Sequence, residues 1–148
     1  MVEESFLIKD VRVFDGENYF ENGFVHVQDG IIKSVGTNLP ETISTTDLRT
    51  ISRPGHTVLP GFIDAHNHGD KGNGDALYQN LRFGVTTIMD LHNEIPYVRK
   101  LKKIAREEVK LAADFKCAGV AATVEDGWPE SVVTAHDKSP EVSQELNS

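Results

Sequence analysis

The second half of the chain alternates short β-type runs with segments of helical periodicity, and this order constrains the fold more than any other feature. Apolar or β-branched runs start at Thr57 (TVLPGFIDAH), Val85 (VTTIMDL) and Phe115 (FKCAGVAAT). Between them, residues 75–83 and 96–112 place their apolar side chains on one helical face. Short apolar strands that alternate with helices are typical of a parallel sheet covered by those helices. We therefore predict an α/β fold that begins β-α-β-α-β, with the strand from Thr57 buried.

Three residues mark where the helices begin and end. Asp75 is placed to cap the helix formed by ALYQNLRF, and Gly84 is placed to terminate it. Pro96 falls in the first turn of the second helix, where a missing amide hydrogen removes no helical hydrogen bond. The first strand leads into the glycine-rich stretch GDKGNGD, which we predict to be a flexible loop.

The N-terminal part of the chain is predicted to consist mainly of β-strands. Residues 5–14 (SFLIKDVRVF) resemble a half-covered strand, and Asp15-Gly16 marks a turn. In FVHVQDGIIKSVG, two β-branched runs flank Asp29-Gly30, a dipeptide that adopts the positive φ angles of a tight hairpin. Residues 36–53 are polar and predict a loop with a short strand. This pattern predicts strands and loops over 1–57, ahead of the α/β segment over 58–148.

Composition excludes several classes of partner. The formal net charge is -8, whereas binding to nucleic acid needs clustered lysine and arginine. The basic run from Arg99 to Lys103 is followed by Glu107 and Glu108, so we interpret it as the solvated face of a helix. No stretch has the roughly 18 apolar residues of a membrane span. The acidic first residues do not match a secretory signal.

The single cysteine indicates a reducing compartment. Cys117 lies in an apolar run, and a buried, inert thiol is a better interpretation than a nucleophile. An internal disulfide is excluded because there is no second cysteine. Together with the missing signal and membrane span, this predicts a cytoplasmic protein.

Two histidines at the end of the first apolar run are the strongest candidates for metal ligands. In a strand, residues two apart project from the same face, so His66 and His68 can converge while Asn67 faces away. Imidazole nitrogen is a preferred ligand of Zn²⁺. Asp64 shares the same alternation and could support the site one step deeper. Functional groups gather at the carboxyl ends of parallel strands, which favours a metal site over exposed polar residues or packed core histidines.

The second apolar run also ends in polar residues. Asp90 and His92 follow the same alternation, so they could face the same edge of the sheet as the histidine pair. The alternative for Asp90 is a structural hydrogen-bond acceptor at the strand end. The alternative for His92 is an exposed loop residue.

Taken together, these motifs resemble the amidohydrolase superfamily over nearly the whole chain. The pattern is the N-terminal VFDGENYFENGFVHVQDGIIKSVG followed, after a gap, by VLPGFIDAHNHGD. The stretch FGVTTIMDL is similar to the second strand of the imidazolonepropionase-like branch. The resemblance implies the first part of a (β/α)8 TIM-type barrel, preceded by the N-terminal strands of a small β-sandwich. Residues 58–148 would supply the first three β/α units.

The same resemblance implies a metal-dependent hydrolase. His66 and His68 would bind one or two divalent metal ions, with zinc as the expected element. The enzyme would act on a small-molecule substrate, hydrolysing non-peptide C–N amide bonds, cyclic ones included, with water activated by the metal. The family site also uses a bridging carboxylated lysine or glutamate, two further histidines and an aspartate, none of which is assigned in this chain. No catalytic residue is therefore identified, and Asp64, Asp90 and His92 remain candidates for supporting or pocket residues.

The length of the chain leads to a further expectation. A complete barrel takes about 250 residues, whereas this chain has 148. We therefore expect a truncated and inactive portion of a longer enzyme, whose full-length form could be a homo-oligomer. The alternative is a non-catalytic scaffold or assembly protein that retains the amidohydrolase fold.

Overall fold

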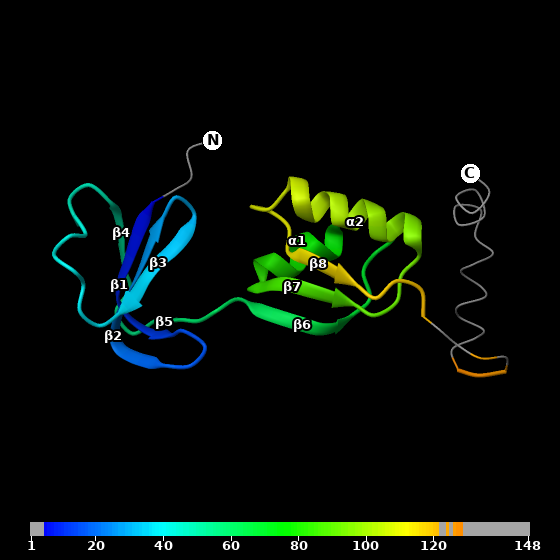
Figure 1. The fold of residues 1–148 in the computed structure, drawn as a ribbon, viewed down its shortest axis with the longest axis horizontal. Coiled ribbons are helices and arrows are strands. Elements are labelled where there is room, and N and C mark those ends of the chain that lie inside the picture. The colour runs from blue at the N-terminus through cyan, green and yellow to red at the C-terminus, as the bar shows by residue number, and fades with distance from the viewer. Residues whose placement is uncertain (1–4, 122–123, 125, 129–148) are drawn as a thin grey trace. The chain divides into compact units, whose positions relative to one another are not determined.

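The computed structural model describes residues 5–121, 124 and 126–128 and contains two compact units (Figure 1). The N-terminal unit ends at Pro60 and the C-terminal unit begins at Gly61. The division falls after Pro60 rather than after residue 57, because Thr57 and Val58 form a short strand that pairs with the first strand of the chain.

The N-terminal unit is a five-stranded sheet with the order β3-β2-β1-β4, in which β5 also pairs with β1. The first three strands are antiparallel neighbours, whereas β4 and β5 run parallel to β1. The strands are β1 (Phe6–Phe14), β2 (Tyr19–Gln28), β3 (Ile31–Gly36), β4 (Arg49–Ser52) and β5 (Thr57–Val58). This confirms the predicted N-terminal strand, the hairpin and the short strand within the polar segment.

The hairpin between β2 and β3 forms at the predicted dipeptide. Asp29 and Gly30 both have positive φ angles, 52° and 74°. A two-residue turn of this kind matches the right-handed twist of the strands that it joins. On this sheet, Val11 and Val13 of β1 form a buried cluster with Val25 and Val27 of β2.

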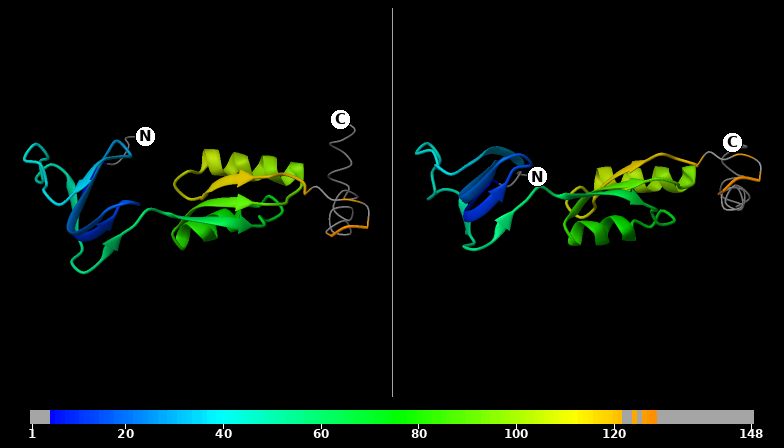
Figure 2. Two further views of the ribbon diagram at one scale, coloured as in Figure 1. Left: turned by 60° about the horizontal axis from the view of Figure 1, so that its bottom comes forward. Right: turned by 90° about the horizontal axis from the view of Figure 1, so that it is seen from below.

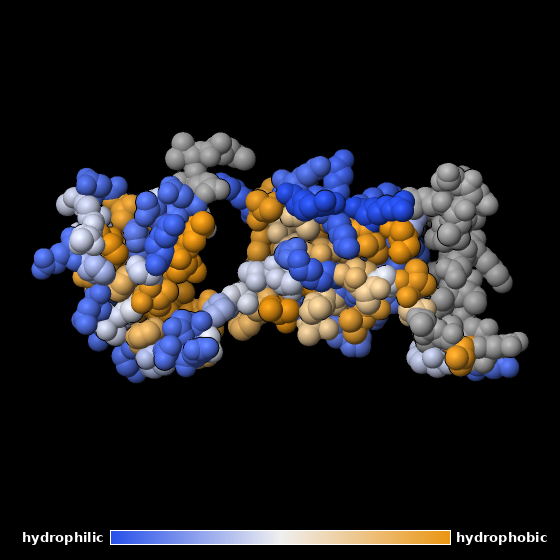
Figure 3. Space-filling model, in the orientation of Figure 1, coloured by the Kyte–Doolittle hydropathy of each residue, from blue (hydrophilic) through white to orange (hydrophobic). Residues whose placement is uncertain are grey.

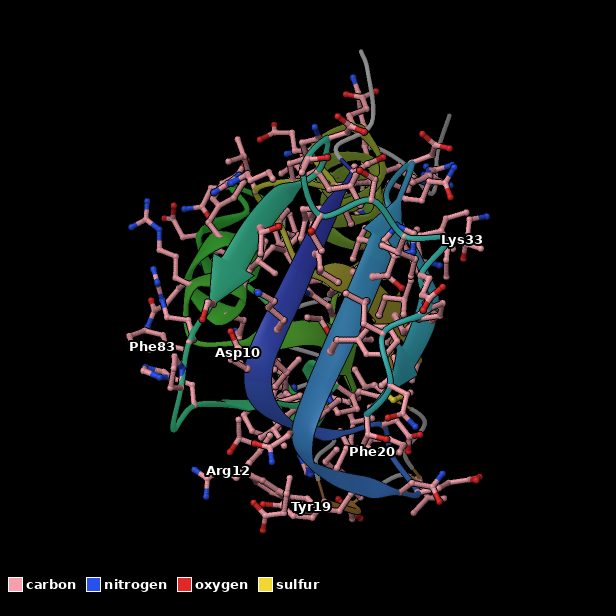
Figure 4. All side chains as sticks on the ribbon, turned by 90° about the vertical axis from the view of Figure 1, so that its left-hand side faces the viewer. Asp10, Arg12, Tyr19, Phe20, Lys33 and Phe83 are labelled. Atoms are coloured by element: carbon pink, nitrogen blue, oxygen red, sulfur yellow. The ribbon has the colours of Figure 1, made fainter. Side chains whose placement is uncertain are left out.

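Asp10 divides β1 into two segments with different partners (Figure 4). Its φ angle is 57°, and the pairing of β1 with β2 shifts register between Ile8 and Val11. Before Asp10, β1 pairs with β4, and after it, β1 pairs with β5. The Asp10 carboxylate accepts a hydrogen bond of 2.6 Å from the hydroxyl of Ser52, which ties this β-bulge to the end of β4.

The C-terminal unit has the predicted β-α-β-α-β order and a parallel sheet, β6-β7-β8. Figures 1 and 2 show its three arrows pointing the same way. The elements are β6 (Phe62–Asn67), α1 (Asp75–Arg82), β7 (Val85–Asp90), α2 (Ile95–Glu107) and β8 (Asp114–Cys117). Both helices share one core with the sheet, because Leu77 of α1, Leu101 of α2 and Ile88 of β7 belong to the same buried cluster. The mixed α/β class is therefore confirmed.

The predicted burial of β6 is wrong. Phe62 and Ile63 are 58% and 63% exposed, whereas Ile88 of the neighbouring β7 is fully buried. Within the described residues, β6 has a neighbour on one side only, so it is an edge strand of the sheet. An apolar sequence therefore predicted the strand correctly but could not indicate how many neighbours cover it.

The start of α1 and the length of β8 also differ from prediction. Gly74 occupies the N-cap position, and Asp75 is already inside the helix. The strand β8 ends at Cys117, whereas the predicted run continued to Thr123, and residues 122 and 123 lie outside the described part of the chain. Pro96 stands in the first turn of α2, as predicted.

The exposed side of α2 carries the basic run. Val98, Leu101 and Ala105 are buried on its inner side. Its exposed basic side chains are Arg99, Lys100, Lys102, Lys103 and Arg106. Figure 3 shows a band of hydrophilic residues along this helix. The interpretation of the run as a solvated face is confirmed, and none of the helices in the described part of the chain could cross a membrane.

One side-chain hydrogen bond joins α1 to the residue after α2. The hydroxyl of Tyr78 donates to a carboxylate oxygen of Glu108 at 3.0 Å. This hydrogen bond, together with desolvation and the negative charge of Glu108, raises the pKa of Tyr78 above its ordinary value. The folded chain therefore holds the phenolic proton more tightly than the unfolded chain does.

We predict that Tyr78→Phe makes the stability of the chain less sensitive to alkaline pH. The contribution of Tyr78 is fully present below about pH 10, the ordinary tyrosine pKa, and is lost as the pH rises from there toward the folded-state pKa. Urea unfolding of wild type and variant, at neutral pH and above about pH 10, measures the difference. Tyr19→Phe, at an exposed tyrosine of β2, is the control. An equal alkaline loss in wild type and Tyr78→Phe would contradict the prediction.

Candidate metal and substrate site

A β-bulge at the end of β6 determines which side chains share a face. Asp64 pairs with Ile88, and Asn67 pairs with Asp90, so three steps along β6 oppose two along β7. Ile88 and Asp90 are both fully buried, on the side of the sheet that the helices cover. Asp64 and Asn67 therefore lie on that same side, and the Asn67 amide donates to the Asp64 carboxylate at 2.6 Å.

The two histidines lie on the opposite face from Asn67. Their rings are exposed and close together, with centroids 5.5 Å apart and planes at 78°. The predicted alternation placed Asp64 on the histidine face, and the bulge shows that this was wrong. Asp64 instead accepts the backbone N–H of His66 at 3.2 Å. The Asn67 amide, followed by this backbone bond, lowers the pKa of the Asp64 carboxyl.

His68 is oriented by the backbone of the loop after β7. Its Nδ1 lies 3.4 Å from the carbonyl oxygen of His92, a long hydrogen bond. A carbonyl oxygen can only accept, so Nδ1 must carry the hydrogen in this contact. The Nε2 lone pair of the neutral ring is then available to a cation.

Asp90 is the most deeply buried polar residue near the histidines. One carboxylate oxygen accepts the N–H of Gly69 at 2.7 Å and the side-chain amide of Asn93 at 2.9 Å. The other oxygen accepts the N–H of His92 at 2.9 Å. Asp90 is therefore the structural acceptor that the sequence offered as one of two alternatives, with its carboxylate directed into the protein.

The loop after β6 is held by a carboxylate that sequence reasoning missed. One oxygen of Asp70 accepts the N–H groups of Gly72, Asn73 and Gly74 at 2.8–3.2 Å. The other oxygen accepts the N–H of Ala76, in the first turn of α1, at 2.9 Å. Asp70 thus satisfies the helix terminus that Asp75 was predicted to cap, and it gives the glycine-rich stretch a defined shape. An Asp followed by glycines just ahead of a helix was the available signal.

A cavity of about 310 Å³ adjoins the histidine pair. Its wall combines the loops that follow the carboxyl ends of β6 and β7, and it contains His68 and His92 but not His66. The remaining lining residues are Gly69, Asp70, Lys71, Asn93 and Glu94. Gly69, Asp70 and Lys71 belong to the predicted glycine-rich loop, whereas Asn93 and Glu94 were not predicted as site residues, although each of the five lies within four residues of a strand end at the carboxyl edge. The ring of His92 is engaged in the loop, because its Nδ1 accepts the N–H of Ala121 at 2.9 Å.

Two of the described residues, His66 and His68, have side chains of the kind that bind zinc. The two imidazole rings are neighbours, and the hydrogen bond of His68 uses Nδ1 and leaves Nε2 available. Such a pair suits Zn²⁺, which takes nitrogen ligands. Zinc sites use three or four protein ligands. Within residues 5–121, 124 and 126–128, no group of three His, Cys, Asp or Glu side chains could hold a metal ion. Cys117 adds no ligand, and burial raises the pKa of its thiol, as expected of an inert cysteine.

No family model matches the chain, but individual enzymes do. N-acetylglucosamine-6-phosphate deacetylase of Bacillus subtilis is 37% identical over 70 residues, which are 47% of this chain and 17% of that protein. A dihydroorotase of Thermoanaerobacter is 27% identical over 83% of this chain and 35% of the enzyme. Imidazolonepropionase of Clostridium tetani is 32% identical over 52% of this chain and 19% of the enzyme. These relatives and the structural neighbours are amidohydrolases. The predicted resemblance to the amidohydrolase superfamily is confirmed.

Solved amidohydrolase structures share the fold. Molinate hydrolase matches 81% of this chain and 31% of its own, with a TM-score of 0.62 and 23% identity. A mutant atrazine chlorohydrolase of Arthrobacter aurescens, complexed with zinc and atraton, matches 82% of this chain and 37% of its own, with a TM-score of 0.61 and 19% identity. The chain spans about a third or less of the length of these amidohydrolases and of the three curated relatives.

Gly69 is predicted to tolerate no side chain. A Cβ at this position would lie 2.7 Å from the Asp90 carboxylate and 3.0 Å from the side chain of Leu101, both of which are fully buried. Overpacking of this kind costs about 1–3 kcal/mol. We therefore expect Gly69→Ala to lower the free energy of unfolding of the C-terminal unit by that amount, as measured by urea titration.

Gly36→Ala, measured on the unfolding of the N-terminal unit that contains Gly36, is the control for this substitution. A Cβ at Gly36 would lie 3.6 Å from the ring of Phe24, an ordinary contact, so no steric cost is expected. Equal effects of the two substitutions would show that the packing around Gly69 is not as close as described.

Proposed function

We propose that this chain is the N-terminal part of a metal-dependent amidohydrolase that hydrolyses a non-peptide C–N amide bond of a small molecule. In this proposal, β6, β7 and β8 are the first three strands of a (β/α)8 barrel, and the N-terminal sheet contributes to a β-sandwich. The observation that carries the proposal is the histidine pair at the carboxyl end of β6, with Nδ1 of His68 directed at a backbone carbonyl. Ligand histidines characteristically donate their second ring N–H in this way.

The related enzymes support the reaction class. They include a deacetylase, a dihydroorotase and an imidazolonepropionase, and the fold is shared with molinate hydrolase and a phenylurea hydrolase. Zinc is the cation in one of the solved structures with this fold, which supports zinc here. The imidazolonepropionase-like branch stays a proposal, because the deacetylase and dihydroorotase match at comparable identity.

In the proposed site, the residues of this chain bind a cation and shape one wall of the substrate pocket. His66 and His68 would hold the divalent ion, and His68 would bind through Nε2. When bound, such an ion polarises a substrate carbonyl and lowers the pKa of water toward neutrality. The pocket beside His68 places a lysine, Lys71, and a mostly buried glutamate, Glu94, where they could contact a polar substrate. No residue of the described chain is assigned as the proton acceptor.

We predict that the full chain binds zinc and that His66→Ala and His68→Ala each weaken the binding by at least tenfold. Removal of either imidazole leaves a single ligand from this strand, and one ligand cannot hold the ion by itself. Isothermal titration with zinc, combined with elemental analysis of the purified proteins, measures the effect.

His56→Ala is the control, because His56 is an exposed histidine of the N-terminal unit. Its zinc affinity is expected to equal that of wild type. Absence of zinc binding in wild type, or equal binding in all variants, would contradict the metal site. That result would favour either a scaffold or assembly protein that retains the amidohydrolase fold, or a portion of an enzyme whose remaining metal ligands lie elsewhere.

A further inference from the structure

The loop after β7 holds the peptide groups of His92 from several directions. The N–H of His92 donates to the Asp90 carboxylate at 2.9 Å. The N–H of Asn93, which belongs to the same peptide group as the His92 carbonyl, donates to the carbonyl of Gly119 at 3.1 Å. The ring of His92 accepts the N–H of Ala121 at 2.9 Å. These three contacts leave the His92 carbonyl with little freedom to turn, and this carbonyl contacts Nδ1 of His68.

This contact with the His92 carbonyl bears on which tautomer His68 adopts. A neutral imidazole carries one hydrogen, on either Nδ1 or Nε2, and the free side chain favours Nε2. A fixed carbonyl beside Nδ1 favours the hydrogen at Nδ1 and frees Nε2 for a cation. His92 therefore acts on His68 through its backbone rather than through its ring.

Asp90 connects both ends of this arrangement. The same carboxylate that accepts the N–H of His92 also accepts the N–H of Gly69, the residue after His68. Its third donor, the Asn93 amide, also donates to the carbonyl of Asp70 at 3.3 Å. The carboxylate is fully buried, so its lost hydration must be replaced by these donors. One buried group thus fixes both the backbone next to His68 and the carbonyl that faces its ring.

We propose that Asp90 is a positioning residue that selects the Nδ1–H tautomer of His68, acting through the backbone of His92. The role of this tautomer, which is to present Nε2 to a divalent cation, rests on the proposed function. The tautomer itself is a property of the metal-free chain and can be measured without any cation.

The test uses Asp90→Asn in the full chain, because asparagine keeps the size of the side chain but replaces one acceptor oxygen with a donor. Nitrogen-15 NMR of the imidazole rings, recorded without metal at a pH where His68 is neutral, reports the tautomer. We expect wild type to show the hydrogen on Nδ1 and Asp90→Asn to shift the population toward Nε2. Zinc affinity should fall by about 10–100-fold, the usual cost of losing support behind a metal ligand.

Ile88→Val is the matched control. Ile88 is fully buried on the same strand and the same face as Asp90. Its side chain packs in the core and has no polar atom that could form a hydrogen bond to the loops. This substitution removes one buried methylene group and lowers stability without changing a polar group. It should leave the His68 tautomer and the zinc affinity unchanged, so a general loss of stability is distinguished from a loss of positioning.

Asn93→Ala provides a second variant if Asp90→Asn does not fold. It removes one of the three donors to Asp90 and should shift the tautomer in the same direction by a smaller amount. An unchanged tautomer in the folded variants would overturn the inference, even if wild type binds zinc. A shifted tautomer in a chain that binds no zinc would support the positioning role of Asp90 and contradict the proposed function.

Discussion

The carboxylate of Asp90 is inaccessible to solvent, and its burial is offset by the three N–H groups that it accepts. A buried charge without such partners would cost several kcal/mol. The donors come from both loops at the carboxyl edge of the sheet, so the loops can form this arrangement only together. The shape of the cavity beside the histidines and the conformation of the backbone around His68 both depend on this single group.

Two features of local sequence predicted much of the fold because their physical causes are local. Asp29-Gly30 readily adopts the positive φ angles of a hairpin turn, and Pro96 fits only a first helical turn or a non-helical segment. The parallel sheet followed from apolar strands that alternate with amphipathic helices. Each of these signals is contained within a few residues, and the structure confirms each of them.

The site was less predictable because it depends on pairing between strands. The bulge in β6 moves Asp64 to the helix-covered side, and no pattern within DAHNH distinguishes a bulged strand from a regular one. The exposure of Phe62 depends on whether a neighbouring strand is present, which its own sequence does not encode. Asp70 reaches Ala76 across a loop of several residues, a longer range than the usual capping pattern covers. The histidine pair itself was recognisable because two histidines separated by one residue leave a local signature in the sequence.

The hydrogen bonds of Asp70 also bear on the thermodynamics of recognition. A glycine-rich loop in an extended chain would lose considerable conformational entropy when a ligand ordered it. Here four backbone N–H groups are already bound to one carboxylate, so that entropy is lost during folding. A molecule entering the adjacent cavity would meet a preorganised wall, and more of its interaction energy would remain as affinity.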